Sequence, residues 1–170
     1  LEIKQLFEYK FADDQGLGAP IPEGFQKIPT HFVYDVKHDG RHKARMVAGG
    51  HRTQVPIDSV YSGVVSLAGI RIVTFIAEHN GLDLWGTDIG NAYLESYTKE
   101  KVAFVAGPEF GALEGHTFLI RKALYGLRSS GARWHDRLYD SLIGMGFTPC
   151  KSDPDIWMRP CKDHYEYIAC

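Results

Sequence analysis

The sequence predicts one globular domain of the α+β class. Its 170 residues are 44% hydrophobic, 12% aromatic and 24% charged, and these values are typical of a chain with a single hydrophobic core. Segments with helical spacing and segments with alternating apolar residues follow one another without a strict βαβ repeat, which indicates the α+β class. A chain of this length buries roughly 70% of its unfolded surface, so it needs neither disulfides nor metal to form a core.

The first 26 residues are expected to form an entry segment, with a loop, that leads into the domain. A short amphipathic stretch is followed by glycines and prolines that commonly mark loops: Gly16, Gly18, Pro20, Pro22 and Gly24. The start of the chain lacks the apolar block of a signal peptide, and no apolar run reaches the roughly 18 residues of a membrane helix. We therefore expect an intracellular protein without a membrane partner.

A β-hairpin is predicted, with strands at 30–36 and 43–48 and a turn at 38–40. The first strand is rich in aromatic and β-branched residues, the second has the alternation of an extended segment, and the turn has the sequence His-Asp-Gly. Because alternate side chains of a strand share a face, Lys43 and Arg45 should project together from the second strand.

A helix is predicted over 67–79, because Ser66 can cap its start and Gly81 can end it in the left-handed conformation. The side chains expected to form its buried stripe are Ile70, Val73, Ile76 and Ala77.

A mostly apolar strand is predicted over 82–89, with Asp88 near its end. A carboxylate at such a position can hold a hard cation such as Mg²⁺, although a surface aspartate at a strand end is much commoner than a metal ligand. The elements that complete the domain are a helical turn at 91–96, strands at 101–106 and 117–121, a helix from 130 to about 145, and a hairpin with strands at 155–159 and 165–170.

Positive charge is concentrated in two stretches of a chain whose formal net charge is −2. Residues 27–52 hold six Lys or Arg against two Asp, and residues 121–137 hold five against one. Such patches are suited to binding a polyanion through its phosphates, and two solvated faces are the alternative explanation.

Five segments carry a further pattern: HFVYDVKHDGRHKARMVAGGH (31–51), SVYSGVVSLAGIRIV (59–73), GTDIGNAYLES (86–96), KALYGLRSSGARWHDRL (122–138) and GFTPCKSDPDIWM (146–158). In letters, order and spacing they resemble the reverse transcriptase of copia-type LTR retrotransposons. The resemblance implies a right-hand polymerase, with fingers and a partial palm built from a mixed or antiparallel sheet and packed helices. The truncated domain would cover 27–170, with the fingers hairpin at about 30–48 and the palm from about 82.

The resemblance also implies roles for single residues. Asp88 matches the first catalytic aspartate, and the backbone carbonyl of Ile89 matches a metal ligand beside it. Tyr93 matches an aromatic gate that excludes a ribose 2′-OH by steric clash. The implied nucleotide-binding residues are Lys43, Arg45, Ile89, Tyr93 and Arg128, and the implied platform for template and nucleotide is Leu124, Tyr125 and Gly126. Without the resemblance, core packing would be the simpler explanation for both tyrosines.

Family members continue after the strand at 165–169 into Tyr-Val-Asp-Asp, which brings two more aspartates beside the first, whereas the sequence in hand stops at Cys170. Two-metal phosphoryl transfer needs clustered carboxylates. We therefore expect these 170 residues alone to be inactive and not to hold a pair of Mg²⁺ ions. The chain also departs from the commoner members at 49–51, where they have Lys-Gly-Phe, and at 129–131, where they have Gln-Ala-Pro.

The partners that the resemblance implies are an RNA or DNA template-primer, a deoxynucleoside triphosphate, and the rest of the palm, the thumb and the RNase H domain. The implied location is the cytoplasm, in a virus-like particle, with the nucleus as the alternative. Two other functions stay open: a non-catalytic remnant that binds nucleic acid through its basic patches, and a gene fragment without a function of its own.

Overall fold

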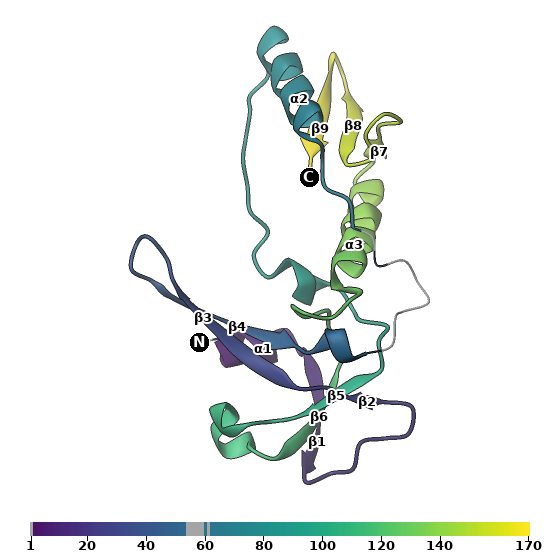
Figure 1. Ribbon diagram of the computed structural model, residues 1–170. Helices are drawn as coiled ribbons and strands as arrows, with labels where there is room; N and C mark the ends of the chain where they lie inside the picture. The colour runs from purple at the N-terminus through teal and green to yellow at the C-terminus, as the bar shows by residue number, and fades with distance from the viewer. Residues whose placement is uncertain (1, 54–59, 61) are drawn as a thin grey trace. The chain divides into compact units, whose positions relative to one another are not determined.

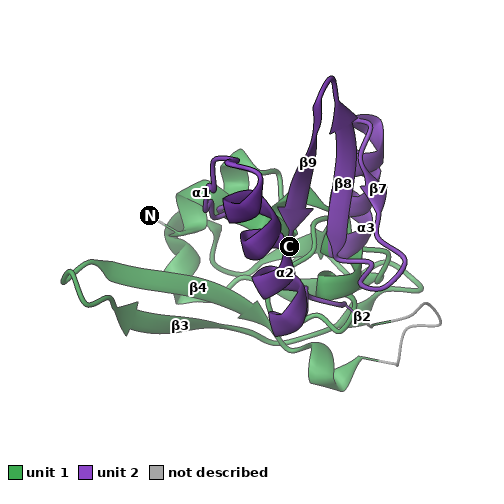
Figure 2. Ribbon diagram, turned by 90° about the horizontal axis from the view of Figure 1, so that it is seen from above, with its two compact units in different colours: residues 1–61, 91–134 green, residues 62–90, 135–170 purple. Residues whose placement is uncertain are grey.

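The computed structural model describes residues 2–53, 60 and 62–170. Helices and strands are mixed along the chain (Figure 1), which confirms a mixed α and β architecture. They form two compact units, unit 1 with residues 1–61 and 91–134 and unit 2 with residues 62–90 and 135–170 (Figure 2). Ser59 and Tyr61, which belong to one of the five sequence segments, lie outside the described residues.

Unit 1 is built on a four-stranded sheet in the order β1-β6-β5-β2. The strands are β1 (Ala12–Leu17), β2 (Gln26–Lys27), β5 (Val102–Val105) and β6 (His116–Ile120). β6 is antiparallel to both β1 and β5, and β2 is parallel to β5. The helices that lie wholly in this unit are α1 (Glu2–Glu8) and the 3₁₀ helices η1 (Gly50–Arg52), η2 (Ala92–Glu95) and η3 (Pro108–Leu113).

Aromatic rings form the centre of the unit 1 core. Phe11, Phe104 and Phe118 are fully buried. The rings of Phe104 and Phe118 are stacked with their centroids 5.3 Å apart, and that of Phe11 lies 6.3 Å from Phe118. Such ring pairs contribute roughly 0.5–1.5 kcal/mol beyond the area that they bury. The core therefore joins β5 and β6 to the segment that precedes β1.

The prediction of an entry segment with a loop over residues 1–26 holds for 18–25, which have no regular structure, but not for the residues before them. This segment contains α1 and β1, and β1 is hydrogen-bonded to β6 with Ala12 opposite Ile120. The glycines that suggested a loop have a more local role: Gly16 and Gly18 have φ angles of 97° and 64° at the end of β1. Gly16 lies where the register of β1 with β6 shifts between Asp14 and Leu17, and Gly18 begins the turn after the strand. The pairing partner of β1 lies too far along the chain for local sequence patterns to reveal it.

The hairpin predicted at 30–48 is confirmed. Its strands are β3 (Thr30–Val36) and β4 (His42–Ala48), which are antiparallel neighbours in register from Thr30 opposite Ala48 to Val36 opposite His42. Met46 and Ala48 are buried on one face of β4. Lys43 and Arg45 therefore project from the other face, as the alternation of the strand requires.

Unit 2 contains the helix α2 (Leu67–His79) and an antiparallel sheet in the order β7-β8-β9. The strands are β7 (Thr148–Pro149), β8 (Ile156–Cys161) and β9 (His164–Ala169). The final hairpin is thus confirmed, and Trp157 of β8 is buried with Leu142 and Phe147. The helix α3 (Ser130–Gly144), also as predicted, begins in unit 1 and ends in unit 2.

α2 begins where the sequence predicts, because the Ser66 hydroxyl accepts a hydrogen bond from the N–H of Gly69 at 2.9 Å. Its buried stripe is only partly as predicted. Val73 and Ala77 are buried, but Ile70 is 44% exposed. A Cβ at Gly69 would collide with the side chain of Ile156, so the helix packs on its glycine and Ile70 is turned toward solvent.

The strand predicted over 82–89 is not formed. These residues adopt no regular structure, and Trp85 is 88% exposed. Alternating apolar residues make a strand only where a neighbouring strand satisfies their N–H and C=O groups, and the described residues supply no such neighbour here. Asp88 consequently lies on an exposed segment and not at the end of a strand. None of the helices in the described parts of the chain has the length and apolar character needed to cross a membrane.

The unit 1 core gives a first testable prediction. Phe118→Ala should lower the free energy of unfolding by about 3–5 kcal/mol, because it removes a fully buried ring from a packed cluster. Val105→Ala, a change in the neighbouring strand at a residue that is 38% exposed, should cost about 1 kcal/mol or less. Urea unfolding followed by circular dichroism measures both, and equal losses would contradict this description of the core.

Candidate nucleotide and nucleic-acid site

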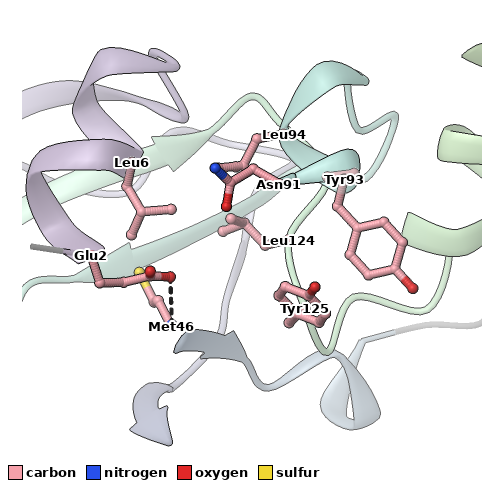
Figure 3. A pocket seen from close by; sticks show the side chains of 9 residues that line it. Glu2, Leu6, Met46, Asn91, Tyr93, Leu94, Leu124 and Tyr125 are labelled. Carbon is pink, nitrogen blue, oxygen red and sulfur yellow. Dashed lines mark hydrogen bonds between the residues drawn. The ribbon is translucent and has the colours of Figure 1, made fainter. Parts of the chain in front are cut away.

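Two tyrosines that are far apart in the sequence meet in unit 1. The ring centroids of Tyr93 and Tyr125 lie 4.9 Å apart (Figure 3). Tyr93 belongs to η2, and Asn91 just before this helix is left-handed with a φ of 54°, a conformation that asparagine tolerates better than most residues. Tyr125 comes from the turn that follows β6. Neither ring is buried in the core, so core packing does not account for the pair.

A cation from β4 completes this arrangement. The guanidinium carbon of Arg45 lies 5.2 Å from the ring centroid of Tyr125, within the range of a cation–π interaction. We call Arg45, Tyr93 and Tyr125 the aromatic–cation cluster. Lys43 lies on the same face of β4, opposite Asp35 of β3. The structure thus brings together residues of the β3–β4 hairpin, of η2 and of the 124–126 turn.

Two glycines allow the turn to approach β4. Gly126 has a φ of 90°, and a Cβ there would collide with the carbonyl oxygen of Ala48. A Cβ at Gly50 would collide with the carbonyl oxygen of Gly126 in turn. The N–H of Ala48 donates a hydrogen bond to the carbonyl of Tyr125 at 2.7 Å. The position of the cluster therefore depends on contacts between backbones.

A small hollow lies beside the two tyrosines. Its walls include Glu2, Met46 and Asn91, and the carboxylate of Glu2 accepts a hydrogen bond from the N–H of Met46 at 3.3 Å (Figure 3). The hollow has a volume of about 20 Å³, which is enough for one water molecule and far too little for a nucleotide. Leu124, which also lines it, is only 2% exposed and supports the turn from inside. Any nucleotide would have to bind on the open surface of the cluster.

Arg128, a predicted nucleotide contact, is held by backbone carbonyls. Its Nε donates to the carbonyl of Gly50 and its Nη2 to that of His51, both at 3.0 Å. The preceding cations of the same basic stretch are engaged as well. Arg121 is paired with Asp13, and the Lys122 ammonium lies 3.9 Å from the ring centroid of Tyr97. The cations of residues 121–137 that contact groups of the protein itself therefore include Arg121, Lys122 and Arg128.

Sequence reasoning missed Glu100. One oxygen of its carboxylate accepts hydrogen bonds from the N–H and the hydroxyl of Ser129, at 3.0 and 2.6 Å. The other oxygen lies 3.3 Å from the hydroxyl of Thr53, which also donates to the carbonyl of Gly50 at 2.8 Å. A glutamate between two lysines looks like a solvated residue in the sequence, and no spacing rule connects it to partners 29 and 47 positions away.

Asp88 and Ile89, the predicted catalytic and metal-binding residues, belong to unit 2 and lie on the exposed segment described above. Within the described ranges, no three His, Cys, Asp or Glu side chains gather closely enough to hold a metal ion. The roles of both residues therefore stay predictions.

Comparison with known proteins gives the family. A family model described as reverse transcriptase (RNA-dependent DNA polymerase) matches residues 19–166, which is most of the chain. This chain belongs to the reverse transcriptase family. The resemblance carried by the five sequence segments is thereby confirmed.

Three relatives are polyproteins of transposons. The retrovirus-related Pol polyprotein from transposon RE1 of Arabidopsis thaliana is 30% identical over 84% of this chain. The one from transposon TNT 1-94 of Nicotiana tabacum is 24% identical over 82%, and the transposon Ty1-DR4 Gag-Pol polyprotein of Saccharomyces cerevisiae is 29% identical over 84%. The reverse transcriptase domain in hand spans 9–11% of the length of these polyproteins. No solved structure matches it.

The close approach of the turn to β4 gives a prediction. Gly126→Ala should lower the free energy of unfolding by about 2 kcal/mol or more, because the new Cβ combines an unfavourable positive φ with a collision against the backbone of β4. Gly144→Ala is the matched control, since a Cβ at the end of α3 meets no atom within 4 Å and alanine favours the helix. Equal stability of the two variants in urea unfolding would show that the turn does not touch β4.

Proposed function

We propose that this chain forms the fingers and the first part of the palm of a copia-type RNA-directed DNA polymerase. In this proposal unit 1 binds the template-primer and the incoming deoxynucleoside triphosphate. The observation that carries it is the aromatic–cation cluster, in which the partly buried Arg45 and Tyr93 both contact Tyr125, which is 42% exposed. Positive charge beside an accessible aromatic ring is the combination that binds phosphates and stacks bases.

Lys43 and Arg45 are proposed to hold the triphosphate. They project from one face of β4, and the planar guanidinium of Arg45 can donate two parallel hydrogen bonds to phosphate oxygens. Its contact with the ring of Tyr125 limits the directions in which the long side chain can point. Less conformational entropy is then lost when a phosphate binds.

Tyr93 is proposed to be the gate for the sugar. A ring in this place excludes a ribose 2′-OH by steric clash only if the ring cannot move away. Tyr125 packs against it at 4.9 Å and opposes such a movement. Leu124, Tyr125 and Gly126 would form the platform beneath template and nucleotide, with the buried Leu124 as its anchor.

Mg²⁺ is proposed as the cofactor of the intact polymerase, held by the carboxylate of Asp88 and the carbonyl of Ile89. Both are oxygen ligands of the kind that Mg²⁺ prefers, and Asp88 is exposed. The ion would lower the pKa of the primer hydroxyl and stabilise the leaving pyrophosphate. A pair of ions needs several clustered carboxylates, and only Asp88 of these 170 residues matches a catalytic position.

One prediction concerns catalysis. These 170 residues alone should not extend a primer on a homopolymer template with Mg²⁺ and dNTP, because a single matched carboxylate cannot hold two ions. Incorporation of radiolabelled dNTP measures this, with a complete retroviral reverse transcriptase as the positive control. Robust incorporation that survives Asp88→Asn would overturn the assignment of Asp88.

A second prediction concerns binding. The affinity for an RNA·DNA template-primer should fall steeply with salt, and Lys43→Gln and Arg45→Gln should each lower the slope of log K against log salt by about 0.9. Lys151→Gln, which removes an exposed lysine of unit 2, is the charge-matched control and should leave the slope unchanged. Fluorescence anisotropy with a labelled duplex measures the slopes. Absence of binding at low salt would refute the proposed function.

A further inference from the structure

Two turns of unit 1 meet beside the aromatic–cation cluster. The first, 48–53, continues from β4 through η1, and the second, 124–129, carries Tyr125. Their backbones touch at Gly50 and Gly126. Two charged side chains add hydrogen bonds here. Arg128 of the second turn bonds to the first turn, and Glu100 bonds to both turns.

Arg128 extends from the second turn and binds the first. Its Nε and Nη2 donate to the carbonyls of Gly50 and His51, which are consecutive in the chain. The guanidinium holds its N–H donors in one plane, so it can donate to two neighbouring carbonyls in a fixed orientation. A lysine ammonium has the same charge but is a point donor on a flexible stem, so it could not reproduce this geometry.

Glu100 holds both turns from a third segment, between η2 and β5. Its carboxylate accepts two hydrogen bonds from Ser129 and approaches the hydroxyl of Thr53. Ser129 is 3% exposed and Thr53 is 8% exposed, so water cannot replace the carboxylate at either residue without local opening. Hydrogen bonds to a charged acceptor in such surroundings are stronger than those between neutral groups.

We propose that Glu100 and Arg128 are positioning residues that lock the two turns together and so fix Arg45 and Tyr125 for binding nucleic acid. Neither acts by touching the bound phosphates. The inference depends on the proposed function of unit 1, and it assigns Arg128 a different role from the direct nucleotide contact that the resemblance implies. It predicts a specific signature: loss of the lock weakens binding but leaves the number of phosphate contacts, and hence the salt slope, unchanged.

Substitutions of Arg128 separate the two roles. If Arg128 positions the turn, Arg128→Lys and Arg128→Gln should weaken template-primer binding alike, each roughly tenfold, with the wild-type salt slope. If Arg128 contacts a phosphate, Arg128→Lys should bind nearly as wild type and Arg128→Gln should lose about 0.9 from the slope. The second result would overturn the proposal for Arg128.

Substitutions of Glu100 test the other half of the lock. Glu100→Ala should weaken binding roughly tenfold at an unchanged slope. Glu100→Gln should restore most of the affinity, because its carbonyl can accept from Ser129 while its amide donates to the hydroxyl of Thr53. Glu114→Ala, which removes the charge of an exposed glutamate at the end of η3, is the control for net charge and should bind as wild type. Equal effects of Glu100→Ala and Glu114→Ala would refute the positioning role of Glu100.

Each variant is checked by circular dichroism at the assay temperature. If Glu100→Ala is unfolded, Thr53→Val replaces it, since this change removes only the hydroxyl that contacts Glu100 and Gly50. It should weaken binding by a smaller factor, roughly threefold, without a change in slope; wild-type binding by folded Thr53→Val would count against the lock. Failure of the wild-type chain to bind at low salt would instead refute the proposed function, so the two failures are distinguishable.

Discussion

The close approach of the 124–126 turn to the end of β4 determines where the candidate binding residues lie. Neither Gly50 nor Gly126 could carry a side chain without a collision between the two backbones. Because both lack one, the carbonyl of Tyr125 reaches the N–H of Ala48, and the ring of Tyr125 lies under the guanidinium of Arg45. A longer distance between the backbones would separate the cation from the ring and the ring from Tyr93. The contacts of Tyr125 with Arg45 and Tyr93 thus depend on glycine at positions 50 and 126.

The arginines of this chain differ in the groups that they contact. The guanidinium of Arg45 lies over the ring of Tyr125, whereas Arg128 donates from two of its nitrogens to backbone carbonyls and Arg121 is paired with Asp13. Counting charges along the sequence gives these residues equal weight in attracting a polyanion. In the structure, Arg121 and Arg128 of the stretch after β6 both have partners within the fold, although both are exposed, whereas Arg45 contacts an aromatic ring and is partly buried.

Local sequence signals identified the elements that depend on local contacts. The β3–β4 hairpin follows from alternation and a His-Asp-Gly turn, and the start of α2 follows from Ser66, whose hydroxyl caps Gly69. Signals failed where a distant partner decides the structure. β1 forms because β6, about a hundred positions later, pairs with it, and the apolar segment 82–89 stays irregular because no strand among the described residues pairs with it.

The candidate site shows the same division. Family resemblance selected Arg45, Tyr93 and Tyr125, and the structure brings them together. The resemblance gave no indication of Glu100. The contacts of this residue are with two buried hydroxyl residues, Thr53 and Ser129, and they follow from no sequence motif. Polar residues that fasten one loop to another have no periodicity and no fixed spacing, so only coordinates reveal them.

The residues proposed for binding and those proposed for catalysis belong to different units of this chain. The aromatic–cation cluster is held by backbone contacts and charged hydrogen bonds within unit 1, which has its own aromatic core. Asp88 and Ile89 belong to a segment of unit 2 that is exposed throughout 83–90 and has no strand partner among the described residues. The proposed binding residues are therefore supported by contacts that do not involve the segment of Asp88, so nucleic-acid binding and primer extension by this chain have to be measured separately.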